Sequence, residues 1–321
     1  MNFKKDLPLT SSHWGTYRAK VKDGKVKELI GWENDKDPSP IGQGIVDVHN
    51  HQTRIDSPMI RKSWMDKGPG SNNSLRGTDP FISISWDEAE KIVSNELNRV
   101  KNDFGNASIF GGSYGWASAG RFHHAQSQLH RFLNCIGGYT RSKFTYSFAA
   151  AEAMVPHILG SYRAFLDTCT SWDSIEENTK LFICFGGVPL KNGQIAQGGT
   201  GSHKQKEKLI RSANAGIKFI NFSPLKSDLL DEVNGEWLAL RPNTDVAIML
   251  GLAHTLYKEK LYDDKFIEKY TEGFDTFLPY LLGDIDGIVK DANWASSISE
   301  IPSKKIISLA KEMSSKRTMI S

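Results

Sequence analysis

Tyr114 and Trp116 are two aromatic hydrogen-bond donors that stand in a run of small residues, GGSYGWASAG at 111–120. Glycine lets other groups approach the backbone closely, so an aromatic ring flanked by glycines can point into a cleft. A phenol O–H and an indole N–H could then position a polar substrate. The alternative is a turn in which both rings only pack, and the spacing alone does not decide between the two interpretations.

Asp47, His49 and His51 form a second pattern that could do chemistry, a D-x-H-x-H run. Because Ile45 and Val46 precede it, we expect a strand, whose alternation would put both imidazoles on one face for a metal ion. The pattern resembles the first-strand metal motif of amidohydrolases and predicts zinc-dependent hydrolysis. Two histidines with one residue between them are common by chance, so the alternative is a pair of polar residues beside a loop.

Asp245 and the loops around it could bind a nucleotide. The chain has no G-x-x-x-x-G-K-[ST] motif, and GGTGS at 198–202 does not open an apolar helix after a strand. The P-loop and dinucleotide fingerprints are therefore absent. Main-chain amides at strand ends could still hold a nucleotide, with Asp245 accepting from a guanine or a ribose. The alternative for Asp245 is an acidic residue in the first turn of a helix, favoured by the helix dipole.

From about residue 178 onward, strands and helices alternate, which predicts βαβ units and a parallel sheet. Short β-rich runs at 180–187, 217–223 and from 237 flank a helix near 203–214. We expect Thr244 to cap a helix that begins at 245, and Ser303 to cap the last helix. Ligands in such sheets bind at the carboxyl ends of the strands, here the loops GGVPLKN, NFSPLKS and LRPNTD.

The first half of the chain has a different pattern of predicted secondary structure. Short strands and irregular loops fill the first 80 residues. Ser85 and Glu88 have the spacing of a capping box, which predicts a helix over 86–101. We expect a short buried strand at 108–112 and a helix near 121–134. The chain stops on the start of a strand after 317, so we expect it to be a fragment.

Composition excludes several classes of function. The formal net charge is only +3 at pH 7, so nucleic acid is not an expected partner. No run approaches the about 18 apolar residues of a membrane span. The first 15 residues lack an apolar segment and a twin arginine, which favours the cytoplasm, or the periplasm if a signal was removed. None of the three cysteines precedes Cys135, which excludes an N-terminal iron–sulfur cluster held by four cysteines.

Eight stretches taken together resemble the dimethyl sulfoxide reductase family of molybdopterin oxidoreductases. They are TSSHWG (10–15), SPMIRKSW (57–64), RGTDPFISISWDEA (76–89), GGSYGWASAGRFHHAQSQLHRFLN (111–134), YSFAAAEAMVPHILG (146–160), GGVPLKN (186–192), INFSPLKSD (220–228) and RPNTDVAIMLGLAHTLY (241–257). They follow the family's order over nearly all of the chain. The stretch RFHHAQSQLHRFLN most resembles the branch of biotin sulfoxide and trimethylamine N-oxide reductases.

The resemblance implies an α/β fold of the molybdopterin-oxidoreductase type, truncated because the family is much longer than 321 residues. A small β-rich N-terminal domain is expected at 1–60 and an α/β domain with the molybdenum site at 61–160. A Rossmann-like domain with a parallel sheet, binding the guanosine dinucleotide, is expected at 161–321 and is incomplete at its C-terminus.

The resemblance also assigns residues. Ser147 matches the serine whose oxygen ligates molybdenum, Trp116 the cofactor-binding tryptophan whose indole N–H bonds the oxo group, and Tyr114 the tyrosine that positions the substrate oxygen. The pterin- and guanosine-binding loops match Lys191, Asn192, Asn221, Ser223, Pro242, Asn243 and Asp245.

The implied cofactor is molybdenum bound by bis(molybdopterin guanine dinucleotide), without an iron–sulfur cluster. The implied activity is oxygen-atom transfer to molybdenum from an S-oxide or N-oxide: biotin sulfoxide, methionine sulfoxide or trimethylamine N-oxide. Electrons would come from a separate donor, either a cytoplasmic reductant or a membrane cytochrome. The alternatives are the zinc-dependent amidohydrolase using Asp47, His49 and His51, and an inactive fragment that binds a nucleotide without turnover.

Overall fold

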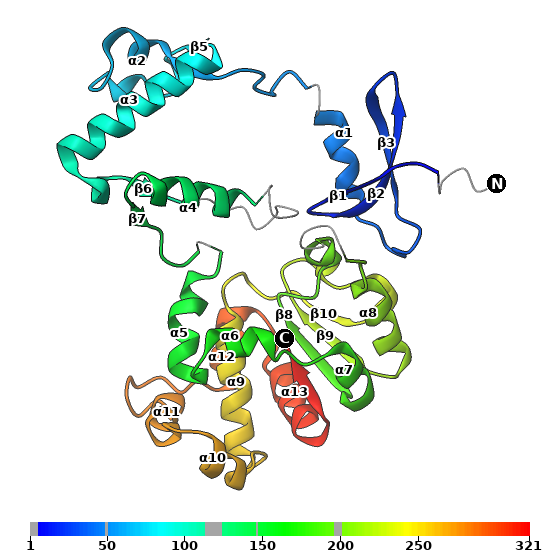
Figure 1. Cartoon of the computed structure of the whole chain (residues 1–321). Coiled ribbons are helices and arrows are strands. Elements are labelled where there is room, and N and C mark those ends of the chain that lie inside the picture. The colour runs from blue at the N-terminus through cyan, green and yellow to red at the C-terminus, as the bar shows by residue number, and fades with distance from the viewer. Residues whose placement is uncertain (1–5, 49–50, 113–123, 146, 196–200) are drawn as a thin grey trace. The chain divides into compact units, whose positions relative to one another are not determined.

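The computed structural model describes residues 6–48, 51–112, 124–145, 147–195 and 201–321. The chain divides into two compact units (Figure 1). Unit 1 comprises residues 1–160 and 195–202, and unit 2 comprises residues 161–194 and 203–321. None of the helices that the structure describes is both long enough and apolar enough to cross a membrane.

Unit 1 combines small sheets with helices. Its strands are β1 (Leu9–Ser12), β2 (Gly15–Lys22), β3 (Lys25–Gly31), β4 (Met59–Arg61), β5 (Phe81–Ser83), β6 (Phe110–Gly111) and β7 (Thr140–Arg141). Its helices are α1 (Gly44–Val48), α2 (Lys62–Lys67), α3 (Trp86–Phe104), α4 (Ala125–Cys135) and α5 (Ala149–Leu159). Strands β1, β2 and β3 form an antiparallel sheet in that order, and β6 pairs in parallel with β7.

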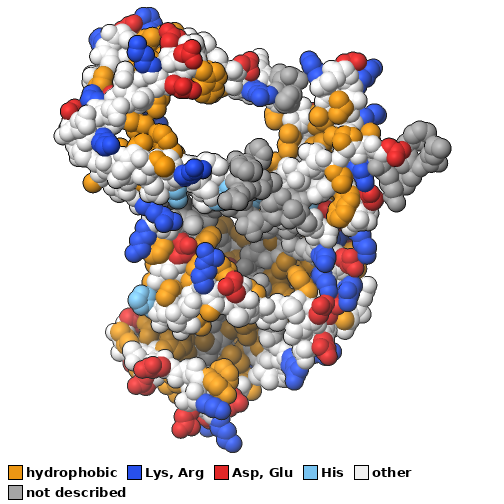
Figure 2. All heavy atoms as spheres, viewed as in Figure 1, with side chains coloured by type: hydrophobic (Ala, Val, Ile, Leu, Met, Phe, Trp, Pro, Cys, Tyr) orange, Lys and Arg blue, Asp and Glu red, His pale blue; other side chains and the backbone are white. Residues whose placement is uncertain are grey.

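Helix α3 confirms the predicted capping box. The Ser85 hydroxyl accepts from the Glu88 N–H at 3.2 Å, and the Glu88 carboxylate accepts from the Ser85 N–H at 2.9 Å. None of the residues of α3 is buried, although its apolar side chains recur at helical spacing. Trp86, Val93 and Phe104 are well exposed, and Figure 2 shows hydrophobic side chains at the surface over the region of this helix.

Unit 2 confirms the expected parallel sheet. Its strands are β8 (Leu181–Phe185), β9 (Lys218–Phe222), β10 (Glu236–Leu238) and β11 (Thr318–Ile320), in the order β10-β9-β8-β11 and all parallel. Its helices are α6 (Tyr162–Asp167), α7 (Trp172–Asn178), α8 (Gln205–Asn214), α9 (Asp245–Lys258), α10 (Asp264–Tyr270), α11 (Phe274–Leu282), α12 (Ala292–Ser299) and α13 (Ser303–Ser315). This α/β architecture is the fold class that the sequence predicts.

The sheet of unit 2 is covered on both faces, which explains why its strands are continuous apolar runs. Leu181 and Ile183 of β8 face a core built with α9, α12 and α13. Phe182 and Cys184, which alternate with them, face a second core with Leu209 of α8. Because every strand runs in the same direction, the loops after β8, β9 and β10 lie at one edge of the sheet (Figure 1).

One local prediction is wrong, and a second is confirmed for the position of the residue but not for its hydrogen bond. Helix α13 begins at Ser303 itself, with Pro302 at the N-cap position, because the Pro302 carbonyl already accepts from the Lys305 N–H at 2.8 Å. Thr244 does occupy the N-cap position of α9, but its hydroxyl makes no capping bond. It donates instead to the Arg241 carbonyl at 2.6 Å, which closes the turn before the helix.

Candidate functional site in the strand-end loops

Asn221, near the carboxyl end of β9, is a buried side chain whose amide has no protein partner. The residue is 1% exposed, and neither its Nδ2 nor its Oδ1 atom has a hydrogen bond within the described part of the chain. A buried amide without a partner costs free energy, because folding removes its hydrogen bonds to water. This cost is offset when a ligand supplies the missing donor and acceptor.

A pocket of about 300 Å³ opens beside this amide. The pocket is mostly polar and is lined by Asn221, Lys226, Leu229, Leu230, Asp231, Asn234, Gly235 and Trp237. Asn221 and Trp237 are register partners on β9 and β10, so their side chains leave the same face of the sheet as neighbours. Asn221 therefore borders a space of the size in which small ligands bind.

The loop after β8 approaches the loop after β9 very closely. Gly187 has φ +79°, and a Cβ atom added to it would lie 2.3 Å from the Asp228 carbonyl oxygen. The Val188 N–H donates to that same oxygen at 2.8 Å. Only glycine fits at this position, since any side chain would push the two loops apart.

Asp228 joins these loops through its side chain as well. Its carboxylate accepts from the Ser223 hydroxyl at 2.6 Å and from the Lys191 ammonium at 3.2 Å. These donors lower the pKa of Asp228, the Ser223 hydrogen bond having the largest effect. Sequence analysis did not identify Asp228, whose only signal is an acidic residue inside the SPLKSD loop.

The seven residues predicted for the cofactor loops all belong to unit 2. Lys191 and Asn192 lie in the 3₁₀ turn Leu190–Gly193 after β8, whereas Asn221 and Ser223 lie at the end of β9. Ser223 is fully buried, and its hydroxyl is occupied by the hydrogen bond that it donates to Asp228.

The third loop leads into α9. Pro242 and Asn243 form the turn before it, and Asn243 adopts a left-handed backbone with φ +65°. Asp245 is the first residue of α9 and is partly exposed, so its carboxylate is accessible to a ligand at the amino end of a 14-residue helix. The structure thus brings these three loops to one edge of the sheet.

Ser147 belongs to unit 1, where it is exposed just before α5. Its N–H donates to the Thr145 hydroxyl at 3.1 Å, and the Thr145 N–H donates to the Glu152 carboxylate at 2.9 Å. This second bond ties the segment to the first turn of α5. Tyr114 and Trp116, the other two residues predicted for the molybdenum site, lie outside the described residues.

The proposed zinc site does not form on a strand. Asp47 lies in helix α1, which continues the 3₁₀ turn begun by Ser39 and Pro40. Gln43 anchors this segment to β3, because its side-chain carbonyl accepts from the Leu29 N–H at 2.9 Å. His49 lies outside the described residues, and the described part of the chain contains no group of three or more acidic, histidine or cysteine side chains that could hold a metal ion.

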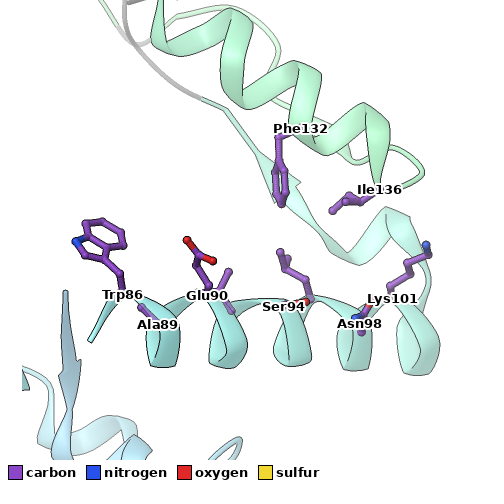
Figure 3. Close-up of a pocket in the computed structure, with 10 residues that line it drawn as sticks. Trp86, Ala89, Glu90, Ser94, Asn98, Lys101, Phe132 and Ile136 are labelled. Atoms are coloured by element: carbon purple, nitrogen blue, oxygen red, sulfur yellow. The ribbon is translucent and has the colours of Figure 1, made fainter. Parts of the chain in front are cut away.

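An apolar groove of about 400 Å³ lies between α3 and the end of α4 (Figure 3). Trp86, Glu90 and Ser94 extend from α3 on the side of Phe132 and Ile136. None of the residues predicted to do chemistry lines it. The groove belongs to unit 1 and shares no residue with the strand-end loops of unit 2.

Comparison with known proteins identifies the family. Residues 54–319 match the model of the molybdopterin oxidoreductase family, and residues 10–48 match the N-terminal domain of molybdopterin oxidoreductases. The chain belongs to the molybdopterin oxidoreductase family.

The similar proteins include three reductases. The chain is 39% identical to a dimethyl sulfoxide/trimethylamine N-oxide reductase of Rhodobacter capsulatus over 97% of this chain and 38% of that one. It is 40% identical to a biotin sulfoxide reductase of Cereibacter sphaeroides (89% and 39%) and 36% identical to a trimethylamine-N-oxide reductase of Haemophilus influenzae (97% and 38%). The chain thus spans about two fifths of the length of these relatives, and the amidohydrolase alternative has no support.

The fold also matches a solved structure. Acetylene hydratase from Pelobacter acetylenicus aligns with a TM-score of 0.63 and 20% identity, over 95% of this chain and 38% of that one. At this level of identity the likeness concerns the fold alone.

Family membership implies a molybdenum–pterin cofactor, and two observations show that unit 2 fits such a group. The unpartnered amide of Asn221 can accept and donate hydrogen bonds to a polar ligand. The close approach at Gly187 holds the loops after β8 and β9 together at the edge of the sheet where ligands of such folds bind.

Proposed function

We propose that this chain contributes the N-terminal part of a molybdenum-dependent reductase that removes oxygen from S-oxides or N-oxides. The observation that carries the proposal is the buried, unpartnered amide of Asn221 in a pocket at the edge of a parallel sheet. Ligands of such sheets bind at this edge. The reductases named above support the reaction class, with trimethylamine N-oxide, biotin sulfoxide and methionine sulfoxide as candidate substrates.

The nucleotide part of the cofactor is, in this proposal, guanosine, and the cofactor is bis(molybdopterin guanine dinucleotide). Lys191 carries a positive charge on an exposed side chain beside the β8 loop, suited to a phosphate oxygen. Asn192, Pro242 and Asn243 would shape the loops around it. Asp245 is an acceptor, and guanine presents N–H donors on its base-pairing edge, so this carboxylate favours guanine over adenine.

When bound, the cofactor supplies two-electron oxygen-atom transfer chemistry, and the protein supplies position and electrostatics. Ser147 would provide an oxygen ligand, a hard donor suited to a high-valent metal. It lies just before α5, whose free N–H groups favour negative charge on a nearby oxygen. Tyr114 and Trp116 would donate hydrogen bonds to the substrate oxygen as it gains negative charge, which is typically worth a few kcal/mol for each donor.

Electrons would reach the site from a separate donor, since we propose that the enzyme carries no iron–sulfur cluster. Cys184 is buried in the sheet, and burial raises the pKa of its thiol to about 12, so it stays protonated and is a poor metal ligand. Cys135 and Cys169 are exposed and belong to different units. A cytoplasmic reductant or a membrane cytochrome remains the candidate donor.

The test is the cofactor content of the protein purified from a host that makes the molybdenum cofactor, with the reading frame of its native gene intact. We expect about one molybdenum and two acid-released guanosine nucleotides per chain, and loss of the three oxides only when a reductant is added. Zinc or iron in place of molybdenum would overturn the proposal. Turnover without added reductant would do the same.

A further inference from the structure

Glu152 is the one acidic residue of α5, whose sequence AAAEAMVPHIL is otherwise apolar apart from His157. It lies in the first turn of the helix, where the helix dipole favours a negative charge. Its carboxylate also accepts a hydrogen bond from the Thr145 N–H at 2.9 Å, which lies seven residues back along the chain. Glu152 therefore holds a backbone group outside its own helix.

Thr145 extends this contact to Ser147. The Thr145 hydroxyl accepts from the Ser147 N–H at 3.1 Å. A threonine hydroxyl bonded to the backbone two residues further on stabilises a tight local turn. Two hydrogen bonds in series thus connect the Glu152 carboxylate with the backbone of Ser147, so the position of that backbone depends on a side chain of α5.

The residue before Thr145 has a backbone conformation that needs support. Phe144 has φ +66°, in the left-handed region that a bulky residue seldom adopts. It lies where the chain has left β7 and leads to α5 (Figure 1). Such a conformation persists only where the surroundings hold it, and residues of this kind cluster at functional sites. The hydrogen bond between Thr145 and Glu152 is a constraint of this kind on the next residue.

Two simpler roles for Glu152 do not account for these contacts. A charge that serves only the helix dipole needs no particular partner outside the helix. A fully solvated carboxylate would leave the Thr145 N–H to water, whereas Glu152 is only partly exposed and bonds to it. An acceptor for this N–H must have an oxygen at the right place and needs no charge, so substitution can separate the roles.

We propose that Glu152 is a positioning residue for Ser147: through Thr145 it fixes the backbone that carries the proposed oxygen ligand of molybdenum. The inference rests on the proposed function, in which Ser147 is that ligand. A serine side chain has one torsion with three staggered positions, so a fixed backbone limits where its oxygen can lie. A ligand placed in this way is ready for the metal before the cofactor binds.

The first experiment measures hydrogen exchange of the Thr145 and Ser147 amides by NMR in the cofactor-free chain. Glu152→Ala speeds both amides about tenfold, the scale of one hydrogen bond. Glu152→Gln keeps an oxygen acceptor without the charge, so both amides stay slow. Thr145→Val keeps its N–H and loses the hydroxyl, so only the Ser147 amide speeds up. Thermal unfolding of each variant checks that unit 1 remains folded.

The second experiment uses the protein purified with its cofactor and with the reading frame of its native gene intact. X-ray absorption of molybdenum reports its oxygen ligands, and the metal left in Ser147→Ala gives the spectrum without the serine. Glu152→Ala shifts the spectrum toward that reference and lowers kcat about tenfold at unchanged KM, because the proposed role acts through Ser147 and not on the substrate. Glu152→Gln stays close to the wild type. Glu90→Ala, a matched change at an exposed glutamate of α3, alters neither quantity.

Three results would overturn the inference: equal effects of the Gln and Ala variants of Glu152, a wild-type molybdenum spectrum and kcat in Glu152→Ala, or a Ser147 amide that stays slow in Thr145→Val. The last result does not require Glu152→Ala to fold. All three leave the proposed function standing, because the wild type still carries molybdenum and reduces the oxides. A wild-type protein without molybdenum contradicts the proposed function, and the inference with it.

Discussion

We propose that Asn221 is a residue whose burial lowers the stability of the ligand-free protein and favours binding of a ligand. Its amide occupies a position in β9 where its neighbours on the strand, Ile220 and Phe222, are fully buried apolar side chains. The ligand-free protein bears the cost of an amide without partners among the described residues, and in our proposal a bound ligand removes that cost. Residues of this kind are expected at binding sites, where local rules of packing are broken for function.

Asn221→Leu tests both effects, on the free energy of unfolding and on ligand binding. Leucine has a similar size and no polar atoms, so we expect the free energy of unfolding of the ligand-free chain to rise by about 1–3 kcal/mol. Binding of guanosine diphosphate should fall at the same time. Urea unfolding and calorimetry measure the two effects. The control is Asn214→Leu at an exposed helical position, where the change in stability should stay within about 0.5 kcal/mol.

Ser147→Ala tests the proposed metal ligand. The variant lacks the oxygen donor, so we expect molybdenum content and oxide reduction to fall together while the fold of unit 1 is kept. Elemental analysis and a reductant-dependent assay measure these quantities. Ser94→Ala, a change at an exposed serine on α3, should alter neither. Full turnover and full molybdenum in Ser147→Ala would move this serine out of the metal site.

At the scale of elements, α3 is a helix whose beginning is defined by its own sequence. The capping box satisfies two N–H groups that no preceding turn could reach. The helix has no buried residue, so packing contributes less to it than to the helices that cover the sheet of unit 2. Its stability should therefore depend unusually strongly on the cap.

Ser85→Ala removes this cap. We expect it to destabilise unit 1 by about 1 kcal/mol and to increase hydrogen exchange in the first turn of α3. Ser94→Ala, in the middle of the same helix, should be neutral or slightly stabilising because alanine is the better helix former. Native-state hydrogen exchange distinguishes the two variants, and equal effects would contradict a specific role for the cap.

The same cap predicts a dependence on pH. The hydrogen bonds from the Ser85 N–H and hydroxyl lower the pKa of Glu88 below its ordinary value of 4.5. A carboxylate whose pKa is depressed by folding stabilises the folded state above its unfolded pKa, and this contribution is lost as the pH falls through the folded value. We expect the NMR shift of the Ser85 amide to report a transition below pH 4.5. Glu88→Gln, which does not ionise, should abolish it.

At the scale of the whole molecule, function is proposed to begin in unit 2, where a covered parallel sheet presents three loops at one edge. The chain spans about two fifths of the length of its relatives, so the proposed activity concerns a longer polypeptide than this one. Nucleotide binding is the property that can be tested on these 321 residues alone.

Guanosine diphosphate should stabilise unit 2 selectively. At a concentration 100 times its dissociation constant, we expect the free energy of unfolding to rise by about 2.7 kcal/mol. Hydrogen exchange should slow in β8, β9 and β10 and stay unchanged in β1, β2 and β3. The Asn221→Leu variant serves as the control without the binding amide. Equal protection of both sheets would place the nucleotide elsewhere.

Local patterns predicted much of the architecture. Continuous apolar runs predicted β8 and β9, a Ser-x-x-Glu pair predicted the start of α3, and the alternation of elements predicted a parallel sheet. The reason is that periodicity, capping and strand burial act over a few residues. At Asp47 the prediction of a strand was wrong, because the segment continues the 3₁₀ turn Pro40–Gln43 as helix α1. The residues of the molybdenum site stay a prediction.

The sequence by itself therefore determined the class of fold, the resemblance to a family and the three loops that could bind a cofactor. Only the tertiary structure decided that the amide of Asn221 is buried without a partner, that Asp228 joins two loops, and that Trp237 stands beside Asn221. These facts depend on how β8, β9 and β10 pair, although helix α8 separates β8 from β9 and a loop separates β9 from β10. These strands are parallel, so no hairpin turn fixes their register, and the burial of both faces of the sheet has to specify it.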